Sequence, residues 1–135
     1  HHKALADEMS EVAPVFDQAF AALITDLEQR GMLDSTLVVV ATEFGRKPDF
    51  SGDGRSHHPV CFSTVLAGGG TKAGFVYGKS DDAGYYPEDD AVSVGAFHAS
   101  IAYAAGMDIE KPATSPSGRP MTVGDEEPPI LELFT

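Results

Sequence analysis

The sequence has few of the residues on which several classes of protein depend. It contains one cysteine, Cys61, and 9 lysine and arginine residues among its 135. A single cysteine excludes an intrachain disulfide framework and a cluster of thiolate metal ligands. No stretch of about 18 apolar residues is present, so the sequence encodes no membrane span.

The shortage of basic residues bears on partners. The 9 basic residues face 21 acidic ones, which gives a formal net charge of −12. Neutralising phosphates requires lysine and arginine, so such a chain is repelled by nucleic acid and by anionic membranes. We therefore exclude nucleic acid as a partner. An acidic surface is compatible with concentrating cations.

What is present indicates a folded chain. With 42% hydrophobic residues the chain can bury a core. Its length corresponds to one domain or to a piece of a larger one. The sequence begins with two histidines and no methionine, which favours a fragment, a processed chain or the remnant of a tag. We therefore treat residues 1–135 as a single, partial domain.

The N-terminal third predicts an amphipathic helix. Apolar residues recur at spacings of three and four, which predicts one buried face, and Gly31 suits the C-terminal cap. Pro14 predicts either a kink or a helix start near Glu11. The apolar residues of this stripe are Met9, Val12, Phe16, Phe20, Leu23 and Leu27.

Two apolar runs read as strands. Residues 37–41 are apolar on both faces, which a parallel strand covered by helices requires. Residues 60–67 predict a second strand, and the three glycines at 68–70 predict a turn after it. The acidic residues of the segment 80–90 lack the spacing of a calcium loop, so we expect a solvated surface there.

The C-terminal third predicts one more helix. Ser93 is a good N-cap, and an apolar residue follows every four residues until Gly106 closes the helix. His98 lies on the flank of this apolar stripe. Residues 117–120 read as a turn, and residues 130–134 as a short docking segment.

Two polar segments at the strand ends are the candidate site. Residues 42–46 (TEFGR) follow the first strand, and residues 54–59 (GRSHHP) precede the second. A strand that delivers a carboxylate beside a histidine loop is typical of sites in open α/β sheets. The guanidinium groups of Arg46 and Arg55 suit a phosphate or sulfate ester. The alternative is a buried strand with polar turns, in which both arginines form ion pairs with local carboxylates.

Five short motifs, taken in order, resemble those of one family. The chain resembles the DUF1501 family, a domain of unknown function that is a relative of sulfatases within the alkaline phosphatase superfamily. The resemblance spans nearly the whole chain. The motifs are GMLDST (31–36), TEFGR (42–46), GRSH (54–57), LAGGG (66–70) and FHASI (97–101).

The resemblance implies a fold. We expect the C-terminal portion of an alkaline phosphatase/sulfatase-like three-layer α/β domain, with a mostly parallel sheet. Similar chains carry a Trp-Asp-x-His motif just before the first helix. His2 is either the last residue of that motif or part of a tag.

The resemblance also implies metal ligands. Glu43 resembles the aspartate that ends a strand in the phosphatases, and His57 resembles their last histidine ligand. Carboxylate and imidazole bind divalent metals, so the implied cofactor is Zn, Mn or Ca. Phe44 stands where those enzymes have a histidine, and Ser56 stands where the family has aspartate; both departures weaken metal binding.

Three histidines are additional candidates. We consider His2, His58 and His98 besides His57. Because neighbouring side chains of an extended segment point to opposite sides, we expect His57 and His58 to diverge.

Three functions follow from these residues and from the resemblance. The first is metal-dependent hydrolysis of small phosphate or sulfate esters, with Arg46 and Arg55 as the catalytic residues that hold the anion. The alternative is a catalytically degenerate relative that binds an anion, a sugar or a partner. The third is a structural module without a site.

Two expectations concern the setting of the protein. The resemblance implies a bacterial protein that is periplasmic or exported. Because the apolar strands need covering layers, we expect the isolated fragment to associate with itself.

Overall fold

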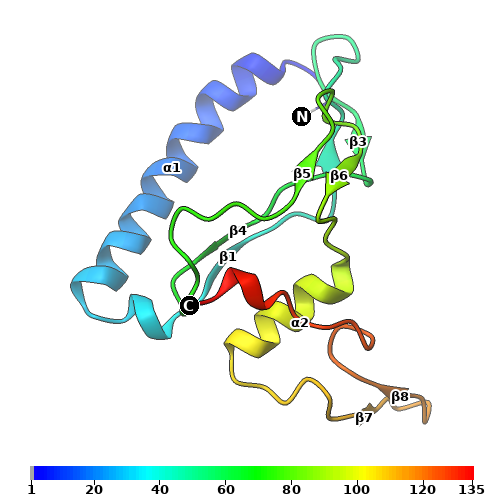
Figure 1. Cartoon of the computed structure of the whole chain (residues 1–135). Helices are drawn as coiled ribbons and strands as arrows, with labels where there is room; N and C mark the ends of the chain where they lie inside the picture. The colour runs from blue at the N-terminus through cyan, green and yellow to red at the C-terminus, as the bar shows by residue number, and fades with distance from the viewer. Residues whose placement is uncertain (1) are drawn as a thin grey trace.

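The structure is a computed structural model that describes residues 2–135, so His1 lies outside the described residues. A long helix α1 (Leu5–Gln29) and a 3-10 turn η1 (Leu33–Ser35) lead into six short strands, β1 to β6. Helix α2 (Val94–Ala104), the strands β7 and β8 and a final turn η2 (Leu131–Leu133) follow (Figure 1). The strands are β1 (Val38–Val40), β2 (Gly45–Arg46), β3 (His57–His58), β4 (Val65–Ala67), β5 (Lys79–Ser80), β6 (Pro87–Asp89), β7 (Ala113–Thr114) and β8 (Pro120–Met121).

The expected three-layer fold with a mostly parallel sheet is wrong. The described residues form two-stranded antiparallel sheets, in the pairs β1–β4, β2–β3, β5–β6 and β7–β8. A parallel pair needs a crossover connection, usually a helix. Between β1 and β4 the chain instead returns through the β2–β3 ladder, so β4 runs against β1, with Val39 opposite Leu66.

The two predicted strands are present but shorter than predicted. Residues 38–40 form β1, and within residues 60–67 the strand β4 begins at Val65. All of β1 is half-buried, so its apolar faces are not enclosed by helices. The three glycines after β4 form the predicted turn, in which the Gly69 N–H donates to the Leu33 carbonyl at 2.9 Å.

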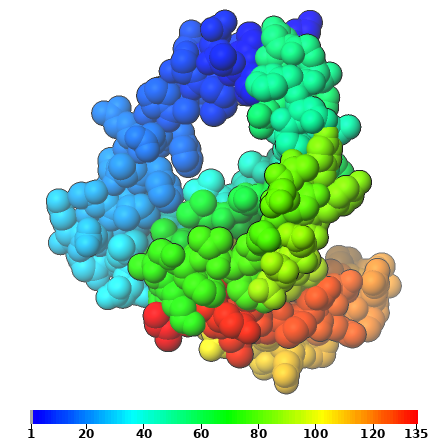
Figure 2. All heavy atoms as spheres, turned by 45° about the horizontal axis from the view of Figure 1, so that its top comes forward, coloured from blue at the N-terminus to red at the C-terminus, as the bar shows by residue number. Residues whose placement is uncertain are grey.

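The first helix is confirmed, but its apolar stripe is not a core. The helix begins at Leu5, includes Pro14, and has one buried residue, Leu27. Phe16 is 53% exposed and stacks on Phe20 with ring centroids 5.7 Å apart. In the space-filling view α1 stands apart from the body of the chain along much of its length (Figure 2).

The small core lies between α2 and the C-terminal turn. The Ser93 side chain accepts a hydrogen bond from the Ala96 N–H, as a helix N-cap does. Ser100 is fully buried; its hydroxyl donates to the Ala96 carbonyl at 2.7 Å and accepts from the Ile130 N–H at 2.9 Å. Residues 130–134 thus dock on α2, as the sequence predicted. The buried apolar residues here are Ala99, Ala102 and Ile130.

Candidate anion-binding site

The two polar motifs meet as a two-stranded ladder. In β2–β3, Arg46 lies opposite His57 and Gly45 lies opposite His58. Residues directly opposite each other in an antiparallel pair place their side chains on the same face. Arg46 and His57 therefore share one face, while the His58 side chain is on the other. The Lys47 N–H donates to the Ser56 carbonyl at 2.9 Å and extends the ladder.

The N-terminal segment adds His2 to the shared face. The Nε2 atoms of His2 and His57 are 2.9 Å apart, and the ring centroids are 4.7 Å apart. Arg46 Nη1 lies 3.3 Å from His2 Nε2 and also donates to the Arg55 carbonyl at 3.3 Å. These three side chains form what we call the cationic cluster: His2, Arg46 and His57.

The hydrogen bonds assign the protons of the cluster. A guanidinium only donates, so His2 Nε2 accepts from Arg46. In the tautomer of His57 that carries its proton on Nε2, this N–H points toward His2 Nε2. Loss of hydration, then the positive charge of Arg46 and then His57, hold the pKa of His2 below its ordinary value of 6.5, although the side chain is exposed.

Aromatic rings support both arginines. Phe44 packs against the His57 ring at 4.0 Å between centroids, and the Arg46 guanidinium lies 5.6 Å from the Phe44 centroid. The Arg55 guanidinium lies 5.0 Å from the centroid of Phe50. Attraction between a cation and a ring face fixes the guanidinium without neutralising its charge.

Neither arginine has a carboxylate partner within the described chain. Ion pairs among residues 2–135 involve Arg30 and Lys79, not Arg46 or Arg55. Arg55 Nε is buried and has no hydrogen-bond partner in the same part of the chain. Buried donors are nearly always satisfied, so this N–H is an exception among the described residues. The alternative that both arginines only form local ion pairs is not what the structure shows.

Glu43 is not brought into the cationic cluster. It is exposed in the loop after β1 and forms no hydrogen bond or ion pair with residues 2–135. Glu43 and Arg46 do line the same shallow hollow, of about 380 Å³, together with Thr42, Phe44, Gly45, Cys61, Phe62 and Ser63. Across residues 2–135 no three His, Cys, Asp or Glu side chains gather as a metal would require.

The comparison with protein families agrees with the motifs. The model of the family described as "Protein of unknown function (DUF1501)" matches residues 1–134. The chain belongs to the DUF1501 family. No curated protein and no solved structure matches it. The match begins at residue 1 and so includes His2. The relationship to sulfatases and alkaline phosphatases stays a prediction.

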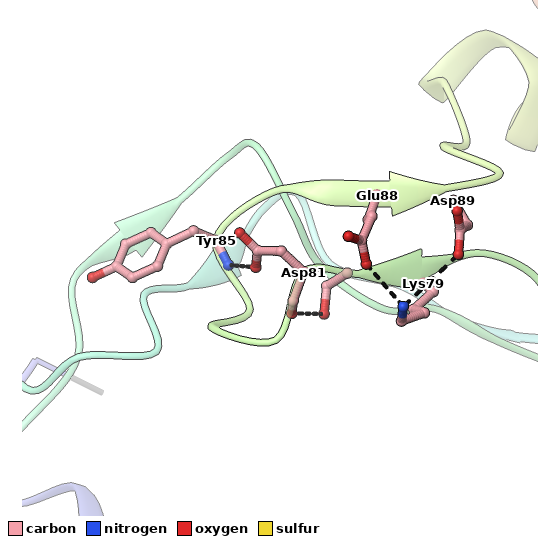
Figure 3. Close-up of polar contacts among 6 residues, drawn as sticks. Lys79, Asp81, Tyr85, Glu88 and Asp89 are labelled. Carbon is pink, nitrogen blue, oxygen red and sulfur yellow. Dashed lines mark hydrogen bonds and ion pairs between the residues drawn. The ribbon is translucent and has the colours of Figure 1, made fainter.

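Two candidate histidines of this DUF1501 chain lie outside the cluster. His58 is buried, and its Nε2 donates to the Tyr85 carbonyl at 2.6 Å. The divergence expected for adjacent histidines is thus observed, and His58 anchors the β5–β6 hairpin. Within that hairpin the Asp81 carboxylate accepts from the Tyr85 N–H at 2.7 Å (Figure 3). His98 is exposed on α2, with its ring centroid 6.1 Å from that of Phe97.

Sequence reasoning missed the aromatic partners of the DUF1501 site. Phe44 carried a usable signal, because it stands two residues before Arg46, and alternate residues of an extended segment share a face. Phe50 lies in an irregular loop, where no periodicity points to Arg55.

Across residues 2–135 no helix is long and apolar enough to cross a membrane.

Proposed function

We propose that this chain binds a small oxyanion, the phosphate or sulfate group of an ester, at the face of the β2–β3 ladder. The carrying observation is that Arg46 lies on one face with His57 and His2, 3.3 Å from His2 Nε2, and has no carboxylate partner in the described residues. The Arg46 guanidinium therefore keeps its charge on the face that it shares with two imidazoles, and a planar guanidinium suits a phosphate or sulfate oxygen pair.

The donors suit an oxyanion. Arg46 supplies a planar guanidinium, which recognises phosphate and sulfate oxygens in pairs. In its Nε2-protonated tautomer, His57 can donate this N–H to an anion oxygen in place of His2. Phe44 holds both groups from one side. The cationic cluster is therefore built from neutral and cationic donors, although Glu43 lines the same hollow as Arg46.

Metal-dependent hydrolysis of the bound ester is the second candidate. The observation that favours it is the 2.9 Å approach of the His2 and His57 Nε2 atoms, since imidazole nitrogens are common ligands of Zn. The donor set does not complete a metal site, because catalytic zinc has about three protein ligands and Glu43 does not join the two histidines. The Arg46 guanidinium, 3.3 Å from His2, also disfavours a second cation there.

The test is calorimetric titration of the protein with sulfate, with and without a chelator. Arg46→Gln should weaken binding about tenfold, equivalent to about 1.4 kcal/mol. Lys47→Gln is the matched control: it removes the same charge from the next residue, whose side chain is exposed. We expect less than about a twofold change for Lys47→Gln, because adjacent residues of an extended segment point to opposite faces and Lys47 is therefore directed away from the cationic cluster.

Three outcomes separate the candidates. Equal losses in the two variants, or no binding of sulfate by the wild-type protein, would overturn the oxyanion site. Binding that survives the chelator supports direct recognition by the side chains. Binding that disappears with the chelator, together with metal found by elemental analysis and lost in His57→Ala, would move the function to the metal-dependent candidate.

A further inference from the structure

The loop that joins β2 and β3 holds the N-terminal segment in place. The Ser51 N–H donates to the Gly54 carbonyl at 2.8 Å and closes a turn over residues 51–54. From the other side, the Leu5 N–H donates to the Asp53 carbonyl at 2.9 Å. The residues just before α1 therefore lie directly on this turn.

Gly54 lies where the two backbones are closest. A Cβ at position 54 would lie 2.6 Å from the Lys3 backbone nitrogen, and closer still to the carbonyl carbon and oxygen of His2. All three atoms belong to the backbone, so no side-chain rotation can relieve the overlap. Ordinary contact begins at about 3.4 Å, so a side chain here would displace the His2–Lys3 backbone by roughly 1 Å.

We infer that Gly54 is the positioning residue of the cationic cluster: the absence of a side chain at 54 lets His2 reach His57 and Arg46. This inference rests on the proposed function. The His2–His57 and His2–Arg46 distances are 2.9 and 3.3 Å. A displacement of roughly 1 Å takes both beyond hydrogen-bonding distance. Arg46 would keep its bond to the Arg55 carbonyl, so the ladder itself would persist.

The matched control lies in the same turn. Gly52 has φ +70, and a Cβ there would meet no atom within 4 Å. Gly52→Ala therefore strains the backbone of the turn without contacting His2. Gly54→Ala displaces His2 but adds no backbone strain, because Gly54 has no positive φ. The pair separates the stability of the turn from the position of His2.

Two readouts test the inference. The nuclear Overhauser effect between the ring protons of His2 and His57, measured by NMR without ligand, reports the position of His2 even if no anion binds. Gly54→Ala should abolish this signal and weaken sulfate binding about tenfold. Gly52→Ala should keep the signal and change the affinity less than about twofold, while lowering the melting temperature by a few degrees.

The outcomes are separable from those of the proposed function. A signal retained in Gly54→Ala, or lost equally in both variants, would overturn the positioning role. A signal lost only in Gly54→Ala, with no sulfate binding by the wild-type protein, would leave the positioning intact and overturn the proposed function. If Gly54→Ala fails to fold, the wild-type protein decides: a nuclear Overhauser effect between the His2 α-proton and the Gly54 α-protons should be present, because the two backbones are in contact. Its absence would refute the docking.

Discussion

Replacing Ser100 by alanine tests whether one buried hydroxyl joins the C-terminal turn to α2. Ser100 is 0% exposed, and its oxygen is the acceptor for the Ile130 N–H at 2.9 Å. The variant leaves that N–H buried without a partner, which costs about 1–3 kcal/mol. Losing the bond that the hydroxyl donates to the Ala96 carbonyl adds little to this cost, because that oxygen still accepts a backbone hydrogen bond within α2.

The assay is urea unfolding, with the slope held common to all variants. At about 2 kcal/mol per molar urea, the midpoint should fall by roughly 1 M. Ser10→Ala is the matched control: its hydroxyl donates to the Asp7 carbonyl at 2.7 Å on the exposed face of α1. That substitution should stay within about 0.5 kcal/mol of wild type. Equal midpoints for the two variants would refute the reasoning.

Three further predictions concern the site and the surface. His58→Ala should lower the free energy of unfolding by about 1–3 kcal/mol, because the Tyr85 carbonyl loses the 2.6 Å hydrogen bond from the buried ring. His98→Ala, at an exposed position, should leave it unchanged. Equal urea midpoints for the two variants would contradict this role of His58. Sulfate affinity, measured by calorimetry, should rise as pH falls from about 6.5 to about 5, because a protonated His2 imidazole attracts anions. Because the pKa of His2 is lowered, the contribution of His2 to the rise in affinity lies below pH 6.5. The same pH profile in His2→Gln would show that His2 makes no contribution. Because Phe16 is 53% exposed on the apolar face of α1, the protein should self-associate in analytical ultracentrifugation, and Phe16→Gln should weaken this association. A wild-type protein that stays monomeric at all concentrations would contradict the expectation.

The helices could be predicted because their signals are local. The apolar spacing of α1, and the Ser93 cap and Gly106 at the two ends of α2, depend on residues within a few positions of one another. The sequence overstated the burial of α1, because periodicity shows which face is apolar but not whether anything covers it. One residue of that helix, Leu27, is buried.

The direction of the strands could not be read from their composition. Residues 37–41 are apolar on both faces, a pattern typical of covered parallel strands. The same pattern is also satisfied by β1 lying against an antiparallel β4, with Val38 opposite Ala67. Strand direction depends on the connection, and residues 41–64 between them are long enough for a crossover helix but lack its apolar periodicity.

Part of the candidate site followed from the motifs and part did not. Arg46 and His57 were proposed from two separate motifs, and the structure places them opposite each other in one ladder. Their proposed roles stay predictions. The approach of His2 depends on the docking of the N-terminal segment on Asp53 and Gly54, a tertiary contact that no local pattern encodes.

The pairing of charges gives the strongest argument for a ligand at this site. Lys79 lies between two acidic neighbours of its hairpin, 2.8 Å from Glu88 and 3.9 Å from Asp89 (Figure 3). Arg46 and Arg55 instead lie against phenylalanine rings within the described residues, and Arg46 also donates to the Arg55 carbonyl. An aromatic ring orients a guanidinium but leaves its charge uncompensated. This difference from Lys79 is the reason that we propose an anion from outside the chain as the partner of Arg46.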